Sequence, residues 1–150
     1  MRNALVVLMA AVVLAGCASS NKPKLPEPLV GIEQVVGPAE LNYPYGPFDV
    51  KYNLAIQNTA PFPITLIRVT VDTTGVAGGA YTLRRGFFYT FKETIAPRET
   101  RIIPFWAHAY GFGHNLRDTE PITLRGIAYF ESPQGAMQRV FFHEISQFPQ

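Results

Sequence analysis

Apolar and polar side chains alternate along the segment FDVKYNLAIQN, from Phe48 to Asn58. Every second residue in it is apolar, namely Phe48, Val50, Tyr52, Leu54 and Ile56. A period of two over this length is typical of a β-strand with one buried face. The segment therefore predicts a strand, and the proline-containing stretch at 59–63 predicts the turn that ends it.

Similar patterns predict a second strand over Ile64 to Asp72, with Ile67, Val69 and Val71 on one face. Further strands are predicted at 80–83, 87–95, 100–109, 122–131 and 137–146. The last two flank Ser132-Pro133-Gln134-Gly135, which suits a type I turn and predicts a hairpin. No amphipathic helix is evident after Cys17, so the pattern predicts an all-β fold, an antiparallel sandwich or barrel.

The start of the chain has a different pattern. One positive residue, Arg2, precedes an apolar run from Ala4 to Gly16, which is too short to span a bilayer. A charged start followed by such a run is typical of a secretory signal peptide. The run ends at Leu14-Ala15-Gly16-Cys17, and Cys17 is the only cysteine in the chain.

This tetrapeptide resembles the lipobox of bacterial lipoproteins. The resemblance implies cleavage between Gly16 and Cys17 and acyl chains on Cys17, which would hold the protein on a membrane. Ala18 follows, where an aspartate would favour retention at the inner membrane, so we expect the outer membrane, facing the periplasm. The expected organisation is a signal peptide at 1–16, a lipidated cysteine and flexible tether at 17–28, and a β-sandwich domain at 29–150.

Composition adds two limits. Removing Arg2 with the signal leaves 12 basic against 11 acidic residues, from 13 and 11 in the whole chain, which is a net charge of +1. A near-neutral protein has no electrostatic footprint for nucleic acid, so we expect no nucleic-acid partner. With Cys17 acylated no thiol remains, so the domain must be held together by packing without disulfides.

Several stretches of the domain are similar to the LEA14/WHy-type domain. They are IQNTAPFPITLIRVTVD, with Asn58 at the end of a strand, then ETIAPRETRIIPF, and ITLRGIAYFESPQGAMQRVFF with Gly126 in its first strand. The similarity covers about 29–142 and implies an immunoglobulin-like or fibronectin-III-like sandwich of about seven strands. The family asparagine is followed directly by proline, whereas Thr59 and Ala60 intervene here.

No motif in the sequence indicates catalysis. The three histidines, His108, His114 and His143, lack the spacing of metal ligands, and the serines lie in no nucleophile motif. We therefore expect no enzyme activity, no catalytic residue, no metal site and no cofactor.

Two stretches are candidate binding surfaces. The segment from 110 to 121 predicts a long loop, and long loops of sandwiches often carry function. Its Tyr110, Phe112, His114 and Asn115 are our candidate binding residues. The second stretch, Arg84 to Lys92, mixes cations with aromatic residues, but the same pattern fits a core strand with Phe87, Tyr89 and Phe91 pointing inward.

The sequence thus predicts a lipid-anchored, exported binding or accessory protein of the bacterial envelope. Its expected contacts are the membrane, through Cys17, and an envelope protein. Two alternatives remain open: a stress-protection lipoprotein of the LEA/WHy kind, and an envelope hydrolase.

Overall fold

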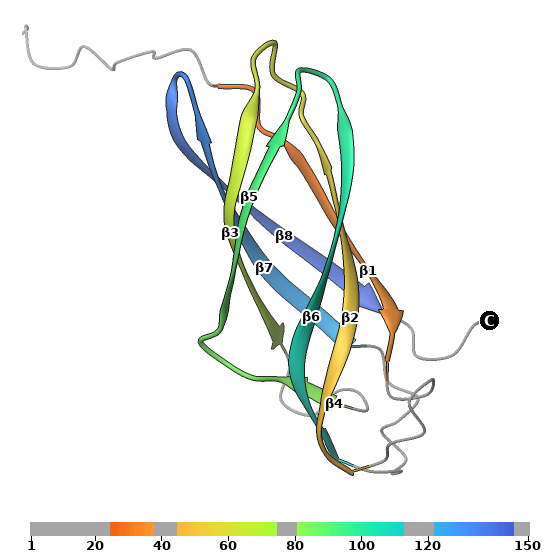
Figure 1. The fold of residues 1–150 in the computed structure, drawn as a ribbon. Helices are drawn as coiled ribbons and strands as arrows, with labels where there is room; N and C mark the ends of the chain where they lie inside the picture. Colours follow the sequence, from red (N-terminus) through yellow and green to blue (C-terminus); the bar gives the residue numbers. More distant parts are fainter. Residues whose placement is uncertain (1–24, 38–44, 75–80, 113–121, 146–150) are drawn as a thin grey trace, which may run out of the picture.

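Eight antiparallel strands form two four-stranded sheets in a computed structural model of the chain, which describes residues 25–37, 45–74, 81–112 and 122–145 (Figure 1). Sheet A has the order β1-β2-β6-β4 and sheet B the order β5-β3-β7-β8. The strands are β1 (Leu29–Val36), β2 (Tyr45–Gln57), β3 (Ile64–Thr74), β4 (Tyr81–Leu83), β5 (Phe88–Ile95), β6 (Thr100–Phe112), β7 (Ile122–Ser132) and β8 (Gly135–Ile145). No helix long and apolar enough to cross a bilayer occurs in these four ranges.

The strand order makes the fold an immunoglobulin-like sandwich. A constant-type immunoglobulin domain has strands A, B, E and D in one sheet and C, F and G in the other. Sheet A reproduces the first order, and β3-β7-β8 reproduces the second, with β5 added beside β3. The predicted fold class is confirmed. The structure has eight strands instead of about seven, and the strand that the sequence patterns did not predict is β1, which pairs with β2.

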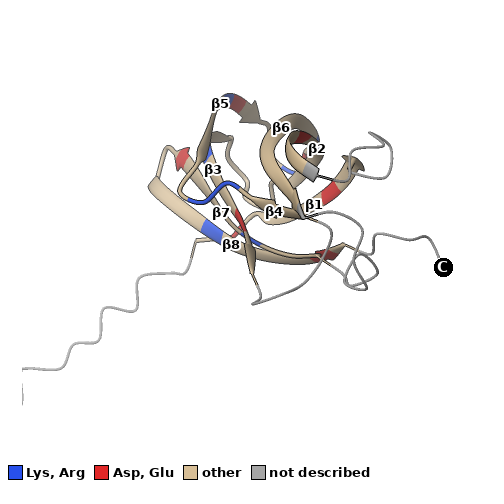
Figure 2. Cartoon of the chain, turned by 90° about the horizontal axis from the view of Figure 1, so that it is seen from below, with Lys and Arg blue, Asp and Glu red and all other residues tan. Residues whose placement is uncertain are grey.

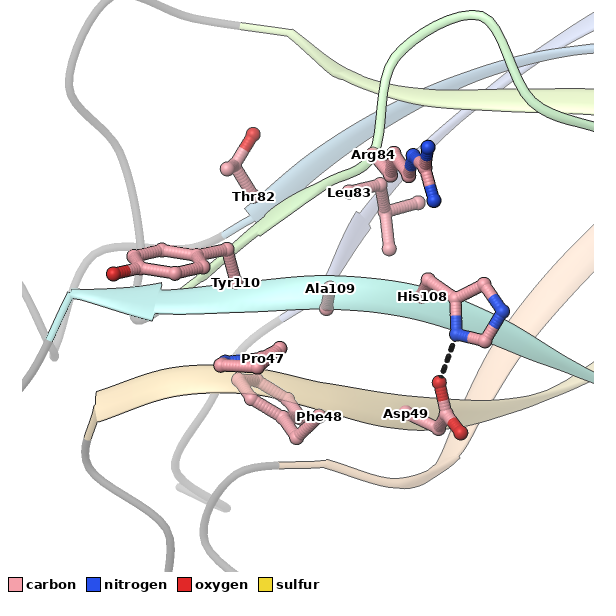
Figure 3. Close-up of a pocket in the computed structure, with 9 residues that line it drawn as sticks. All are labelled: Pro47, Phe48, Asp49, Thr82, Leu83, Arg84, His108, Ala109 and Tyr110. Carbon is pink, nitrogen blue, oxygen red and sulfur yellow. Dashed lines mark hydrogen bonds and ion pairs between the residues drawn. The ribbon is translucent and has the colours of Figure 1, made fainter.

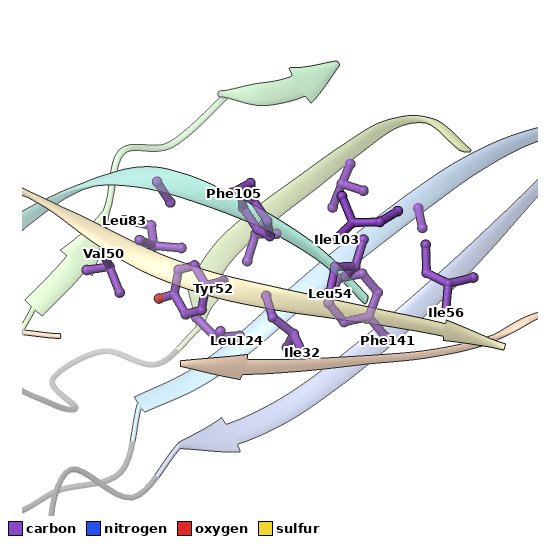
Figure 4. Packing of buried hydrophobic residues seen from close by; sticks show 14 of the residues in the cluster. Ile32, Val50, Tyr52, Leu54, Ile56, Leu83, Ile103, Phe105, Leu124 and Phe141 are labelled. Carbon is purple, nitrogen blue, oxygen red and sulfur yellow. The ribbon is translucent and has the colours of Figure 1, made fainter. Parts of the chain in front are cut away.

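The core lies between the sheets and is built from alternate residues of each strand. Of the inward set predicted for β2, Val50, Tyr52, Leu54 and Ile56 are fully buried (Figure 4), whereas Phe48 is half-buried and packs against the core. In β3 the alternation shifts at a bulge between Leu66 and Arg68, so Ile67 is the extra residue and is only half-buried. The predicted shared face of Ile67 with Val69 was therefore wrong, because a bulge moves the register by one residue.

One close approach in the core requires glycine. A Cβ atom on Gly126 of β7 would lie 2.0 Å from Cζ of the Phe141 ring on β8, which sits opposite it in the ladder. The missing side chain makes room for Phe141, which is buried. The predicted hairpin between these two strands is confirmed, with Ser132 paired to Gly135.

Asn58, immediately after β2, connects the two sheets. It is 1% exposed and is the one buried polar residue besides tyrosines in the part of the chain that the structure describes. Its Nδ2 donates to the carbonyl oxygens of Phe62, Ile95 and Ala96 at 2.8, 3.1 and 3.0 Å, and its Oδ1 accepts from the Ala60 N–H at 2.9 Å. Both ends of the amide are thus satisfied, and the β2–β3 turn is bound to the end of β5.

The turn between β5 and β6 completes this end of the sandwich. The Glu99 N–H donates to the Ala96 carbonyl, and the Asn58 N–H donates to the Glu99 carbonyl. Arg98 has a φ of 62°, a conformation that fits the third position of a turn with Pro97 at the second. Hydrogen bonds from Ala96 N–H and from the Arg101 guanidinium lower the pKa of Glu99.

A chain of hydrogen bonds crosses sheet A inside the core. The Tyr81 hydroxyl donates to Gln34 Oε1 at 2.6 Å, so its own proton is used there. The Tyr52 hydroxyl, 2.5 Å from that of Tyr81, must then be the donor between the two. Burial is the main cause that raises the pKa of Tyr52 well above its usual value, and the neighbouring Tyr81 raises it further.

The boundary of β6 corrects the predicted loop at 110–121. Residues 110–112 continue the strand, because they pair with Pro47, Gly46 and Tyr45 of β2 on one side. On the other side Tyr110 and Gly111 pair with β4. The rest of that segment, 113–121, lies outside the described residues.

We expect Asn58→Ala to lower the free energy of unfolding by about 3 kcal/mol, because it leaves buried carbonyl and N–H groups without partners. Asn58→Asp should cost at least as much, since it turns a carboxylate oxygen toward three carbonyl oxygens. The matched control is Gln57→Ala on the exposed neighbour, expected within about 0.5 kcal/mol of wild type. Urea unfolding measures all three, and an Asn58→Ala value near the control would contradict the role of the amide.

Stability should also fall above about pH 10, the ordinary tyrosine pKa. A raised pKa in the folded state means that the folded protein holds the Tyr52 proton more tightly, so its contribution is complete below pH 10 and is lost as the pH rises further. Urea unfolding at pH 8 and pH 10.5 should show a smaller decline for Tyr52→Phe than for wild type. Equal declines would show that another group titrates.

Candidate functional site

A pocket of about 500 Å³ is drawn in Figure 3. It lies near the first residues of β2, at the opposite end of that strand from Asn58. Its volume falls within the range of small-molecule sites. The lining comes from β2, β4, β6 and the residue after β4: Pro47, Phe48, Asp49, Thr82, Leu83, Arg84, His108, Ala109 and Tyr110. Three strands of one sheet therefore build it.

Cross-strand register places the polar lining together. Asp49 pairs with His108, Pro47 pairs with Tyr110, and Tyr110 pairs with Thr82 on its other side. Residues directly opposite one another in a ladder point to the same face. Residues more than fifty positions apart in sequence thus meet on one surface, while the alternate residues Leu83 and Ala109 point into the core.

The side chains of Asp49, His108 and Arg84 form a row across this part of the pocket. His108 Nδ1 is hydrogen-bonded to Asp49 Oδ1, and both side chains are about half exposed. The Phe87 and His108 rings are nearly perpendicular with their centres 5.8 Å apart, and the Arg84 guanidinium lies 4.8 Å from the centre of Phe87. The row presents one guanidinium and an imidazole to a ligand.

Tyr89 of β5 supports this row from the space between the sheets. Burial raises the pKa of its phenol, and a hydrogen bond from the backbone N–H of His108 offsets part of that rise. Its ring also packs on Phe105 at 4.9 Å and near Phe87 at 6.4 Å. Tyr89 therefore lies beneath this part of β6, while the His108 side chain faces the pocket.

The structure places one of the four candidate binding residues in the pocket. Tyr110 lines it and is 53% exposed. The side chain of Phe112 is not described, and His114 and Asn115 lie outside the described residues, so the binding prediction for these three stays untested.

Sequence reasoning missed Asp49, His108 and Arg84 as a group. The available signal was alternation, and it covered Asp49 alone, which falls on the polar side of the strand predicted over 48–58. The pairing of Asp49 with His108 depends on register, which alternation does not provide. For the segment Arg84 to Lys92, the core interpretation is supported for Tyr89 and Phe91, which pack against the core.

The arrangement offers a binding chemistry: an apolar floor, a cation, and hydrogen-bonding groups at the rim. Within residues 25–37, 45–74, 81–112 and 122–145, no three His, Cys, Asp or Glu side chains gather as metal ligands would. The single serine of those ranges, Ser132, lies in the β7–β8 hairpin and not beside His108.

Apolar side chains continue from the pocket along the outer face of β6. Ile102, Trp106 and Tyr110 are 63%, 52% and 53% exposed, and Pro104 between them is exposed as well. Lys51 of β2 lies over the Trp106 ring at 5.8 Å. Exposed apolar patches on a soluble domain often mark interaction sites.

No protein-family model and no curated protein matches the chain. Solved structures similar to it include a protein from Archaeoglobus fulgidus (10% identity, 81% of this chain and 94% of that chain, TM-score 0.46). Another is a Northeast Structural Genomics Consortium target (13% identity, 80% of this chain and 84% of that chain, TM-score 0.45). A third is the GAE domain of yeast GGA1 (11% identity, 81% of this chain and 94% of that chain, TM-score 0.47). Similarity of this degree says nothing about function.

We expect the polar rim of the pocket to be dispensable for folding. Arg84→Ala and His108→Ala should each stay within about 0.5 kcal/mol of wild type in urea unfolding, because both side chains are exposed. Leu83→Ala, next to Arg84 but 1% exposed, should cost about 3 kcal/mol. If Arg84→Ala or His108→Ala lowered the free energy of unfolding as much as Leu83→Ala, that residue would be needed for the stability of the fold.

Proposed function

We propose that this protein is a lipid-anchored, exported binding protein of the bacterial cell envelope, held on the outer membrane by acyl chains on Cys17 and facing the periplasm. The observation that supports the proposal is that the pocket and the point where the chain enters the domain lie at opposite ends of the domain. The chain enters the domain at the Asn58 end, and the pocket lies at the other end of the same sheet.

The entry point is defined by contacts of the segment just before β1. Pro28 is buried, the Glu27 carbonyl accepts from Thr59 Oγ1 at 2.9 Å, and the Glu27 carboxylate pairs with Arg139. The end of the proposed tether is therefore fixed beside the turn that follows Asn58. Between Cys17 and Leu25 the chain can span at most about 28 Å.

The pocket would then face away from the membrane. Leu29 pairs with Gln57 at the anchored end, whereas Pro47 and Asp49 line the pocket. At about 3.4 Å per residue, the part of β2 that separates Gln57 from the pocket residues covers about 30 Å. A domain anchored at one end in this way presents the pocket and the exposed apolar side chains of β6 to a second envelope component.

The LEA/WHy interpretation is the second candidate, and one observation favours it. The resemblance was carried by an asparagine at a strand end, and Asn58 makes four side-chain hydrogen bonds there. A stress-protection role predicts that the folded protein preserves the activity of a reporter enzyme during drying, and that the unfolded protein does not. Failure of that assay would remove the candidate.

The anchor is tested by mass analysis of the protein from the membrane fraction. We expect a chain that starts at Cys17 and carries acyl mass, and globomycin should make the uncleaved form accumulate. Cys17→Ser should remove the acyl mass and the response to globomycin. An unmodified chain, or one unaffected by either treatment, would contradict the proposal.

Sorting provides a control that leaves the anchor intact. Ala18→Asp should move the lipidated protein toward the inner-membrane fraction, while its acyl mass stays the same. If wild-type protein is already in that fraction, the outer-membrane assignment is wrong and the lipid anchor stands.

A further inference from the structure

The edge of β6 that faces away from β2 is only partly paired. β4 pairs with β6 at Ala109 to Gly111, and the Arg84 N–H extends that contact to the His108 carbonyl. The chain then leaves for sheet B, where β5 pairs with β3. Among the described residues, no strand pairs with this edge from Thr100 to Ala107.

The backbone groups on that edge follow from the register. The His108 carbonyl points to β4, and backbone direction alternates along a strand, so Trp106, Pro104 and Ile102 turn their backbone groups to the same side. The β2–β6 register runs without a bulge, so the alternation holds throughout. The open edge offers the N–H and carbonyl of Ile102 and Trp106 and the carbonyl of Pro104.

Pro104 removes one hydrogen-bond donor from this edge, but it does not prevent another strand from pairing there. Proline lacks an N–H and is tolerated where that group would face solvent, as at the edge of a sheet. Such residues reduce indiscriminate pairing between edges. One donor is missing from the edge, and the donors on either side of it remain.

Apolar side chains flank the open edge on both faces. Ile102 and Trp106 are exposed on the outer face of sheet A. On the inner side, the half-buried rings of Tyr89 and Phe91 pack on Phe105 at 4.9 and 6.0 Å. A strand placed along the edge would cover both sets, because its side chains alternate between the two faces.

The charge around the edge is positive. Arg84 and Arg85 are exposed where β4 ends, and the loop that carries them is blue in Figure 2. Arg85 has no ion pair with another described residue. Glu93 and Glu99 are both engaged by Arg101.

We propose that the open edge of β6, from Ile102 to Trp106, binds an extended peptide segment of a partner protein as an added antiparallel strand, with acidic residues at the amino end of that segment. Strand addition of this kind takes its affinity from main-chain hydrogen bonds and its specificity from the flanking side chains. The added strand continues the line of β4, so its amino end lies beside Arg84 and Arg85 and next to the pocket. The inference rests on the proposed role as a binding protein and names the class of partner.

The probe is the peptide Ac-DDVTVTVT-NH2, added to the protein purified in detergent. Trp106 is the only tryptophan in the chain and lies on the flank of the edge, so its fluorescence reports occupancy directly. We expect a saturable change with this peptide and binding at least tenfold weaker with the basic peptide Ac-KKVTVTVT-NH2. Amide hydrogen exchange should slow at Ile102 and Trp106. It should stay unchanged at Phe105, because the backbone N–H of Phe105 points to β2 and not to the open edge.

Three variants separate backbone pairing from side-chain contact. Pro104→Ala restores an edge N–H and should tighten binding about fivefold, the value of one net hydrogen bond. Ile102→Pro should weaken binding more than Ile102→Ala, since only the proline removes a donor. The backbone groups of Ile102 do not bond to β2, so neither variant breaks the ladder.

Three results would overturn the proposal. The first is no saturable signal at millimolar peptide, and the second is binding that Ile102→Pro leaves unchanged. The third is self-association in sedimentation experiments that Ile102→Pro abolishes, which would make the occupant of the edge a second copy of this chain. None of these tests uses the lipid, so a failure at the edge is distinguishable from a failure of the anchor.

Discussion

The hydrogen bonds of one buried amide determine how the two sheets meet. Asn58 ends β2 of sheet A, and its side chain binds the carbonyl groups of Ile95 and Ala96, where β5 of sheet B ends. No disulfide assists, because the only cysteine lies at position 17. In a sandwich without a covalent link between its sheets, a satisfied buried amide gives a directional contact that apolar packing lacks. The segment at Glu27 and Pro28 lies beside it, so the end of the domain that these hydrogen bonds connect is also the end where the chain enters.

This placement divides the molecule into two parts with different roles. Residues at the Asn58 end are hydrogen-bonded to one another through turns, whereas the opposite end leaves Asp49, His108 and Arg84 exposed around a pocket. Side chains that contribute little to folding are available to contact something else. The exposed row of β6 then links the two ends along the outer face of sheet A, from Ile102 through Trp106 to Tyr110.

Alternation was enough to predict most strands and the class of fold, because burial of one face imposes a period of two. It failed where the backbone departs from that period. The bulge at Ile67 moved the register, and the strand at 110–112 has glycine at its centre and so shows no alternation. The pocket could not be predicted, since it depends on which residue of β6 lies opposite Asp49. Asn58 was noticed through a family resemblance, but its four hydrogen bonds involve three separate turns and strands that the sequence does not bring together.

The shortness of β4 accounts for both the pocket and the open edge. A longer β4 would pair along β6 past His108 and occupy the backbone groups of Trp106 and Ile102. Instead Arg84 makes the last contact and the chain crosses to sheet B, which brings Phe87 and Tyr89 against His108 from the other side. His108 is therefore the boundary between a paired and an unpaired stretch, because its carbonyl accepts a hydrogen bond from the Arg84 N–H while its ring is hydrogen-bonded to Asp49. A peptide strand that continued the line of β4 would begin at this residue, so a side chain at its amino end could reach the pocket while its backbone paired with β6.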